Sequence, residues 1–140
     1  MAADHSETCL NDACLNDPYV AASPENLPFW QAAAKGSFLG KACADCGRFH
    51  WYPRAICPFC SSANTEWRPL SGQGQVYAVS TLRRVSTPYT VAYVQLAEGP
   101  VVLSNLVDMG DAQMAIGMAV RVVFRATPEG RMAPKFTGMA

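Results

Sequence analysis

Residues 43–60 read CADCGRFHWYPRAICPFC and contain two Cys-x-x-Cys pairs that are separated by ten residues. Four thiolates in this arrangement match the tetrahedral shell that Zn²⁺ prefers in structural sites. The four candidate ligands are Cys43, Cys46, Cys57 and Cys60. Gly47 follows the first pair, where such a turn commonly requires a positive φ. The pattern predicts a structural Zn²⁺ site. Two disulfides, or an iron site of the rubredoxin kind held by the same thiolates, are the alternatives.

The role of the metal follows from the number of its ligands. A catalytic zinc keeps one coordination position open for water or substrate, whereas four cysteines close the shell. His50 stands between the two pairs and is expected to be a partly exposed loop residue rather than a ligand. The expected zinc ribbon, residues 41–70, has few aliphatic side chains, so the metal would supply its folding free energy, about 10 kcal/mol in such modules.

The charge distribution separates the beginning of the chain from its body. The 140 residues carry no formal net charge, but the first 30 hold five acidic and no basic side chains. The other 110 residues hold 11 basic and six acidic side chains, a net charge of +5. This excess is too small and too scattered for a dedicated DNA-binding protein. No apolar run approaches the ~20 residues of a membrane helix, and no signal peptide is evident. We therefore expect a cytoplasmic protein.

Residues 1–22 are expected to form an acidic, mobile tail. They contain a short duplication with a period of five, CLNDA followed by CLND, which fits neither a helix nor a strand. Cys9 and Cys14 within it are expected to be plain thiols, although a Cys-x₄-Cys pair is also a possible metal ligand set.

Residues 23–40 are expected to form an N-terminal helical segment. Ser23 suits the N-cap position, Pro24 the first helical position and Glu25 the positive end of the helix dipole. Gly36 is the expected stop.

Residues 71–140 are rich in short stretches of β-branched and aromatic residues. The expected strands are Val76–Leu82, Tyr89–Leu96, Val101–Val107, Val120–Ala126 and Met132–Thr137. A break at residues 108–117 separates the third from the fourth. Five short strands with such a break predict a barrel of the oligonucleotide/oligosaccharide-binding (OB) type, and a β-sandwich is the alternative. The fold class is therefore mainly β, with a helix and a zinc ribbon before the barrel.

The sequence has no recognisable catalytic machinery. It lacks the GxSxG, P-loop and Rossmann glycine motifs, and its only histidines are His5 and His50. The four cysteines with useful spacing are assigned to the metal. We therefore expect no catalysis by this chain alone.

An ordered series of motifs resembles an acyl-CoA-associated family, the domain-of-unknown-function family number thirty-five. It runs through Trp30, Phe38-Leu39-Gly40-Lys41-Ala42-Cys43-Ala44-Asp45-Cys46-Gly47, Tyr52-Pro53-Arg54, Cys57-Pro58-Phe59-Cys60, Trp67, Gly72-Gln73-Gly74-Gln75-Val76, Ser80-Thr81 and Pro88-Tyr89. The match extends from about Leu27 to about Thr137 and implies an N-terminal helix, a rubredoxin-like zinc ribbon and an OB-fold. Tyr52 departs from it, because many members have a proline there, and the acidic tail lies outside it.

The resemblance also implies a function. Members look like non-catalytic partners of thiolase-fold enzymes that act on acyl-CoA thioesters, in a hetero-oligomer whose other subunit supplies the nucleophile and the acid/base histidines. A thiolase or acyltransferase partner is expected over a retro-aldolase, because aldolase-associated ribbons are often fused to a hydratase-like domain. The competing hypotheses are a nucleic-acid-binding OB module and a small independent acyl-CoA enzyme.

Two sets of residues are candidates for these contacts. Arg54, Arg83 and Arg84 could meet the phosphates of CoA, or could simply be solvated surface side chains. Phe29, Trp30 and Trp51 could anchor the partner subunit, since aromatic residues dominate interface hot spots. Their alternative role is packing between the helix, the ribbon and the barrel.

Overall fold

The computed structural model describes residues 17–139, and the predictions for His5, Cys9 and Cys14 lie outside this range. The described part opens with a short helix, α2 (Pro18–Ala21), capped by the Asp17 side chain, which accepts a hydrogen bond from the backbone N–H of Tyr19. Val20 is fully buried, and the Asp17 carboxylate pairs with Arg131 at 2.7 Å. Residues 17–22, which the sequence assigns to the acidic tail, thus contact the body through an apolar side chain and an ion pair.

The helical segment is divided in two by its prolines. A 3₁₀ turn, η2 (Pro24–Asn26), precedes α3 (Leu27–Ala34), with Pro28 in the first turn of α3. Gly36 has a φ of +79°, the left-handed conformation expected at a glycine that ends a helix. The segment ends before residue 40, because Leu39 already begins a strand.

A small antiparallel sheet carries the cysteine pairs. Its strands are β1 (Leu39–Cys43), β2 (Phe49–His50) and β3 (Thr65–Pro69), in the order β2-β1-β3. Lys41 of β1 lies opposite His50 on one side and Trp67 on the other. The two cysteine pairs lie at the ends and in the connections of this sheet, where loops can turn toward a metal.

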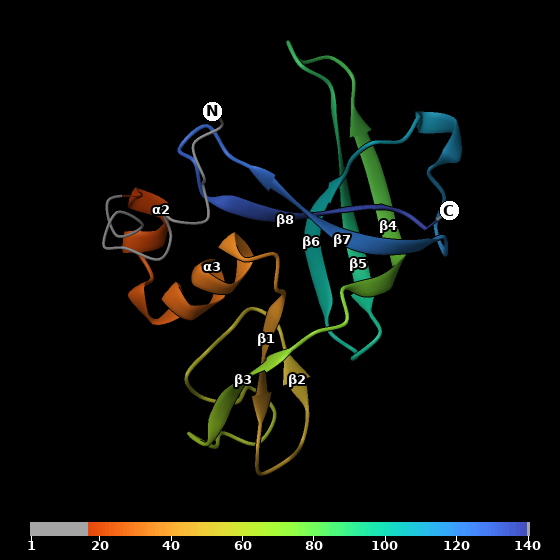
Figure 1. The fold of residues 1–140 in the computed structure, drawn as a ribbon. Coiled ribbons are helices and arrows are strands. Elements are labelled where there is room, and N and C mark those ends of the chain that lie inside the picture. Colours follow the sequence, from red (N-terminus) through yellow and green to blue (C-terminus); the bar gives the residue numbers. More distant parts are fainter. Residues whose placement is uncertain (1–16, 140) are drawn as a thin grey trace.

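The remaining strands close into the expected five-stranded barrel, which rules out the sandwich (Figure 1). They are β4 (Gln73–Leu82), β5 (Tyr89–Leu96), β6 (Val101–Leu106), β7 (Ala119–Ala126) and β8 (Met132–Gly138). Their order around the barrel is β4-β5-β6-β8-β7, closed by β7 on β4. The break after the third strand contains a 3₁₀ turn, η3 (Asp111–Gln113).

The Gly-x-Gly motif marks the entry into the barrel. Gly72 has a φ of +78°, and a Cβ there would lie 2.4 Å from Val122 Cγ1. A Cβ on Gly74 would lie 2.5 Å from the backbone oxygen of Gln95. The two glycines thus allow β4 to approach its neighbouring strands.

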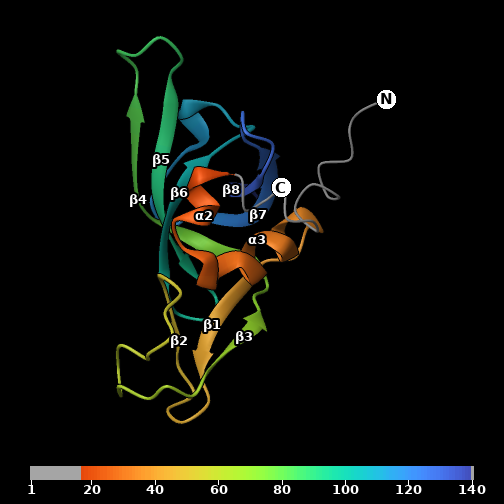
Figure 2. The ribbon, with the colours of Figure 1, turned by 90° about the vertical axis from the view of Figure 1, so that its left-hand side faces the viewer.

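An aromatic cluster joins the helix, the ribbon and the barrel. The Phe38 ring, between α3 and β1, lies 6.1 Å from Phe29 of α3, 6.1 Å from Trp51 of the ribbon and 6.2 Å from Phe136 of β8 (centroid distances). The contacts of Phe38 with Phe29 and Phe136 are edge-to-face, and such pairs contribute about 0.5–1.5 kcal/mol each beyond their burial. The helices lie against the barrel near β8, on the side away from the β4–β5 hairpin (Figure 2). In residues 17–139, no helix combines the length and hydrophobicity needed to cross a bilayer.

Candidate metal centre

The two cysteine pairs fold into two matching turns. In the first, the backbone N–H of Gly47 donates to the carbonyl of Cys43 at 2.8 Å, and in the second, Ser61 donates to Cys57 at 2.9 Å. Both residues after the pairs are left-handed, with φ of +75° at Gly47 and +63° at Ser61. The first turn therefore uses the residue that suits this conformation, and the second accepts a non-glycine residue at some cost.

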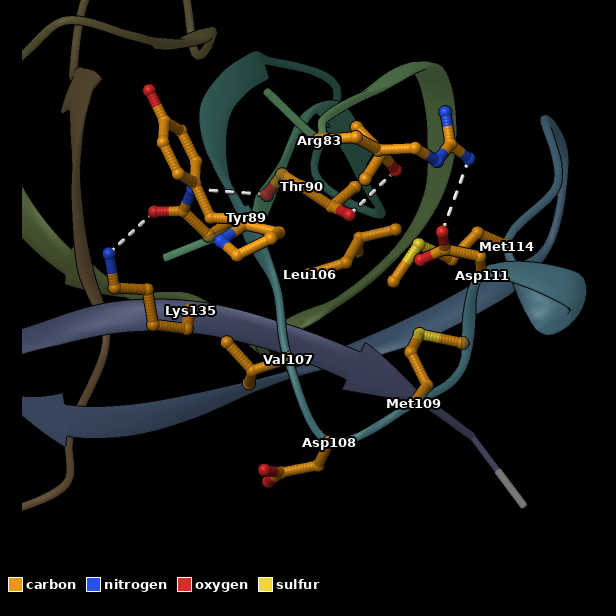
Figure 3. A pocket seen from close by; sticks show the side chains of 13 residues that line it. Arg83, Tyr89, Thr90, Leu106, Val107, Asp108, Met109, Asp111, Met114 and Lys135 are labelled. Carbon is orange, nitrogen blue, oxygen red and sulfur yellow. Dashed lines mark hydrogen bonds and ion pairs between the residues drawn. The ribbon is translucent and has the colours of Figure 1, made fainter. Parts of the chain in front are cut away.

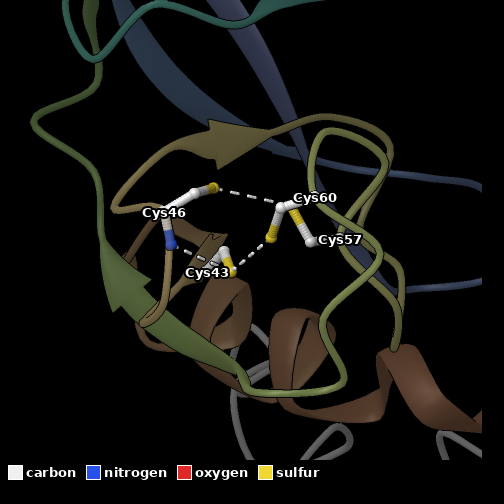
Figure 4. Close-up of side chains that lie close together, drawn as sticks. All are labelled: Cys43, Cys46, Cys57 and Cys60. Carbon is white, nitrogen blue, oxygen red and sulfur yellow. Dashed lines mark hydrogen bonds between the residues drawn. The ribbon is translucent and has the colours of Figure 1, made fainter.

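The four sulfur atoms converge between the turns (Figure 4). All four lie within 4.8 Å of one another, with 3.5 Å between Cys43 and Cys60 and 3.7 Å between Cys46 and Cys57. A tetrahedron with Zn–S bonds of about 2.3 Å has sulfur–sulfur distances of about 3.8 Å. The donor set and its size therefore fit a four-coordinate zinc, and the disulfide alternative fails because these cysteines are free thiols.

Backbone hydrogen bonds favour the thiolate forms of the sulfur atoms, whereas burial and the neighbouring sulfurs oppose them. The backbone N–H of Cys46 points at the Cys43 sulfur and, against burial, lowers the pKa of that thiol to about 7. The backbone N–H of Ser62 favours the thiolate of Cys60, but the neighbouring Cys43 sulfur and burial together raise its pKa to about 12. Four thiols so close together cannot all lose their protons without a positive charge between them. A Zn²⁺ ion held by them would supply that charge and fix the loops.

Asp45 is a supporting residue that the sequence did not indicate. Its carboxylate accepts hydrogen bonds from the Ser62 hydroxyl and, at 3.3 Å, from the Asn64 side-chain amide, so it ties the first turn to the second. The Ser62 hydrogen bond, the largest cause, lowers the pKa of Asp45. Asp45 lies between two ligands, and its partners are distant in sequence, so spacing alone gave no signal.

His50 is buried, with 3% of its surface exposed, whereas a partly exposed loop residue was expected. It lies on β2, and its Nε2 accepts a hydrogen bond from the backbone N–H of Arg54 at 3.3 Å. Burial lowers the pKa of His50, which favours the neutral ring that accepts this bond. It does not belong to the cysteine cluster, in line with the expectation that it is not a ligand.

The three candidate arginines do not form one site. Arg54 belongs to the ribbon and is exposed, while Arg83 and Arg84 lie at the β4–β5 hairpin, which points away from the ribbon (Figure 1). Arg83 pairs with Asp111 at 3.1 Å, and both side chains are more than half exposed.

A cleft of about 770 Å³ opens beside Arg83 at one end of the barrel (Figure 3). Lys135 of β8 lies across it, and Leu106, Met109 and Met114 line the space between the two cations. The Lys135 ammonium donates to Asn105 Oδ1 at 2.6 Å, and burial, aided by Arg131, lowers the pKa of Lys135. Lys135 was missed because a lone lysine on a strand carries no motif.

The three candidate interface aromatics face inward or partly inward. Phe29 and Trp30 are 5% and 9% exposed, and both belong to the buried core. Trp51 is half-buried and packs on the rings of Phe29 and Phe38. Packing between helix, ribbon and barrel is what the structure shows of them, and contact with a partner stays a prediction.

Two family models match successive parts of the chain. Residues 30–66 match the rubredoxin-like zinc ribbon domain of ChsH2, and residues 67–125 match the C-terminal OB-fold domain of ChsH2. The division between the models falls within β3, the strand that leads from the ribbon toward the barrel.

Similar proteins cover most of the chain. A DUF35 domain-containing scaffold protein of Pyrococcus furiosus is 37% identical over 101 residues, which are 68% of this chain and 74% of that protein. A probable enoyl-CoA hydratase alpha subunit of Thermomonospora curvata is 31% identical over 74% of this chain, but the match spans only 34% of that longer protein. The solved Ltp2-ChsH2(DUF35) aldolase contains a chain that superposes with a TM-score of 0.70 at 30% identity, covering 81% of this chain and 93% of that one.

Proposed function

Because this chain belongs to the DUF35 family, we propose that it is a non-catalytic subunit that assembles with a thiolase-fold enzyme acting on acyl-CoA thioesters. The observation that carries the proposal is the likeness to a chain of the Ltp2-ChsH2(DUF35) aldolase, which extends over both the ribbon and the barrel. A thiolase or an acyltransferase is the proposed class of partner.

The geometry supports a structural role for the metal. A closed shell of four cysteines leaves no position for substrate, so the metal stabilises the ribbon rather than activating a water molecule. Within residues 17–139, the one histidine is buried and its Nε2 accepts a hydrogen bond from a backbone N–H, so this nitrogen is not available as a base. The proposal therefore places the chemistry in the other subunit.

A retro-aldolase is the second candidate partner. It is favoured by the name of the aldolase whose chain this one resembles at 30% identity. The two candidates differ in their reaction. A thiolase or acyltransferase transfers an acyl group to a carbon nucleophile or to the thiol of CoA, whereas a retro-aldolase breaks a carbon–carbon bond without attack by a CoA thiol.

The cleft between Arg83 and Lys135 is the proposed place for CoA to touch this chain. The cleft holds two cations and two carboxylates, Asp108 and Asp111, around an apolar floor, so a phosphate of CoA would compete with Asp111 for Arg83. The apolar floor suits the uncharged pantetheine arm. Arg84 lies beside Arg83 on the same hairpin, whereas Arg54 belongs to the ribbon and would need a separate contact.

The experiment is co-purification followed by assay. The tagged full chain is expressed in its native host, the associated enzyme is identified by mass spectrometry, and both are then produced as recombinant proteins. We expect no turnover of acetoacetyl-CoA or β-hydroxyacyl-CoA by the zinc-loaded chain alone, and at least tenfold higher turnover by the complex than by the enzyme alone. Robust turnover by the isolated chain contradicts the proposal. Cleavage of the β-hydroxy thioester without thiolysis identifies the aldolase alternative.

A further inference from the structure

Three neighbouring strands of the barrel carry no charged side chain. The 10, 8 and 6 residues of β4, β5 and β6 include no Asp, Glu, Lys or Arg. By contrast, β7 contains Arg121 and Arg125, and β8 contains Lys135. An exposed strand surface normally alternates apolar residues inward with polar, often charged, residues outward, so this part of the barrel is unusual.

The exposed side chains of these strands are uncharged, and besides the polar Gln73, Gln75 and Ser80 they include five large hydrophobic ones. These five are Tyr77, Tyr89, Tyr93, Val101 and Leu103, and we call them the charge-free face. Tyr93 of β5 lies directly opposite Leu103 of β6, with exposed fractions of 48% and 60%. A bulge in β4 between Val76 and Ala78 adds Tyr77, which is 63% exposed, beside Tyr93.

The barrel does not need this face for its own core. The alternate residues of the same strands, such as Ala92, Val94 and Val102, are 2% exposed or less and fill the interior. Helix α3 packs on the other side, against β8 and β1. The outer tyrosines and Leu103 therefore remain in water in the isolated chain.

The charge-free face continues onto the ribbon through two clefts. Val101 lines one cleft together with Phe59, and Leu103 lines another together with Tyr52. Phe59 is 50% exposed and Tyr52 is 42% exposed. The guanidinium of Arg48 lies 3.6 Å from the centre of the Phe59 ring, so a cation stands at the ribbon end of the surface, where Glu98 lines the same cleft.

We propose that the charge-free face, extended by Tyr52 and Phe59, is the surface on which the catalytic partner subunit docks. This inference rests on the function proposed above and locates its interface. Exposed apolar side chains that run over two modules are typical of a protein–protein interface, and tyrosine is enriched at hot spots. Strands β4, β5 and β6 supply no cation to this face, whereas a polyanion such as single-stranded nucleic acid needs a groove lined with basic side chains. The complementary partner surface is apolar, with an acidic side chain placed to meet Arg48.

The test uses the recombinant partner enzyme identified above and the zinc-loaded full chain. The double variant Tyr93→Asp/Leu103→Asp places two charges at the centre of the face, where both side chains are exposed and folding should tolerate them. The milder variant Tyr93→Ser/Leu103→Ser removes apolar area without adding charge. The matched control is Ile116→Asp, which changes a 71% exposed side chain between η3 and β7, outside the face. Isothermal titration calorimetry gives the dissociation constant of each variant, and circular dichroism checks its fold.

We expect the aspartate variant to bind at least 100-fold more weakly than the wild type, the serine variant at least tenfold more weakly, and Ile116→Asp within twofold. If wild type and both double variants bind alike, the docking surface is wrong while the proposed function stands. If the wild type itself fails to bind, both are overturned. Light scattering and anisotropy with an oligo-dT 20-mer complete the test. A dimer, or DNA binding, that the aspartate variant abolishes would assign the face to a second copy or to nucleic acid and overturn the proposal.

Discussion

The ribbon and the barrel are stabilised in different ways. In the barrel, side chains from all five strands enter one apolar core, and Val76, Val94, Val120 and Phe136 are at most 1% exposed. In the ribbon, the buried side chains are small or polar, such as Ala42, His50 and the two inner cysteines. The barrel therefore depends on apolar burial, whereas the ribbon depends on its metal and a few loop hydrogen bonds.

The two kinds of stabilisation suit two different roles for the barrel and the ribbon. A barrel with its own core can remain folded while its outer face stays free for a partner. A ribbon fixed by a metal can hold exposed side chains such as Phe59 in place without a large interior of its own. The aromatic cluster around Phe38 then fixes the position of one module relative to the other.

Loss of the metal should produce the largest difference in stability between the two modules. Removing Zn²⁺ with a chelator, or changing the buried ligand Cys57 to serine, should unfold the ribbon, because the metal supplies about 10 kcal/mol of its folding free energy. The barrel should keep its β-sheet signal in far-ultraviolet circular dichroism. Hydrogen exchange should show fast exchange in residues 39–69 and slow exchange in β5.

The control for this experiment is Cys9→Ser, which changes a cysteine outside the two pairs and should leave the bound zinc at one equivalent. Cooperative unfolding of the whole chain on chelation would contradict the division into two independently stabilised modules.

A truncation in the barrel should have the opposite effect. Phe136→Ala removes a fully buried ring of β8 and should lower the free energy of unfolding by about 3–5 kcal/mol. The four cysteines do not depend on that ring, so zinc affinity of the folded protein should stay within about threefold. Denaturant titration and competition with a chromogenic chelator measure the two quantities.

The matched control here is Val101→Ala, which truncates an outward side chain of β6 and should cost less than about 0.5 kcal/mol. A cost near that of Phe136→Ala would mean that Val101 is not the surface residue that its 37% exposure indicates.

The ligand set and the strands could be predicted from local pattern. Two Cys-x-x-Cys pairs specify the donor atoms directly, and β-branched runs located all five barrel strands, with Tyr89–Leu96 correct at both ends. The fold class followed from the number of strands and the break between the third and fourth. These features depend on residues that are close in sequence, and for that reason they can be predicted without a structure.

The orientation of the third strand could not be predicted. Val101 and Leu103 are as apolar as Val102 and Leu106, so the sequence gives no preference for either face. The barrel resolves this by burying Val102 and Leu106 and exposing the other two. Asp45, Lys135 and the buried state of His50 likewise depend on contacts between distant segments, which spacing does not encode.

A smaller effect is expected where β4 meets β5. Gly74→Ala should destabilise the protein by about 1–3 kcal/mol, because a Cβ there would lie 2.5 Å from the backbone oxygen of Gln95 and the strands would have to separate. Gly110→Ala is the control, since a Cβ at Gly110 meets nothing within 4 Å. Thermal unfolding of both variants measures the difference, and equal melting temperatures would show that the barrel absorbs the extra atom without cost.

The smallest effect concerns the asymmetry between the two turns that hold the metal. Ser61 has the left-handed conformation that Gly47 has in the first turn, and its side chain pays a steric cost of about 1–2 kcal/mol that a glycine avoids. Glycine is also more flexible in the unfolded chain, which offsets about 0.5–1 kcal/mol of this gain. Ser61→Gly should therefore raise zinc affinity by about twofold to fivefold, measured by chelator competition.

The control is Asp108→Gly, which relieves the same conformation, at a φ of +59°, in the loop after β6. This variant also removes the exposed ion pair with Arg125, so its stability should stay within about 0.5 kcal/mol of wild type. Its zinc affinity should not change. A gain in zinc affinity from both variants would show that strain in the barrel lowers the zinc affinity of the ribbon. The two modules would then be coupled rather than separately stabilised.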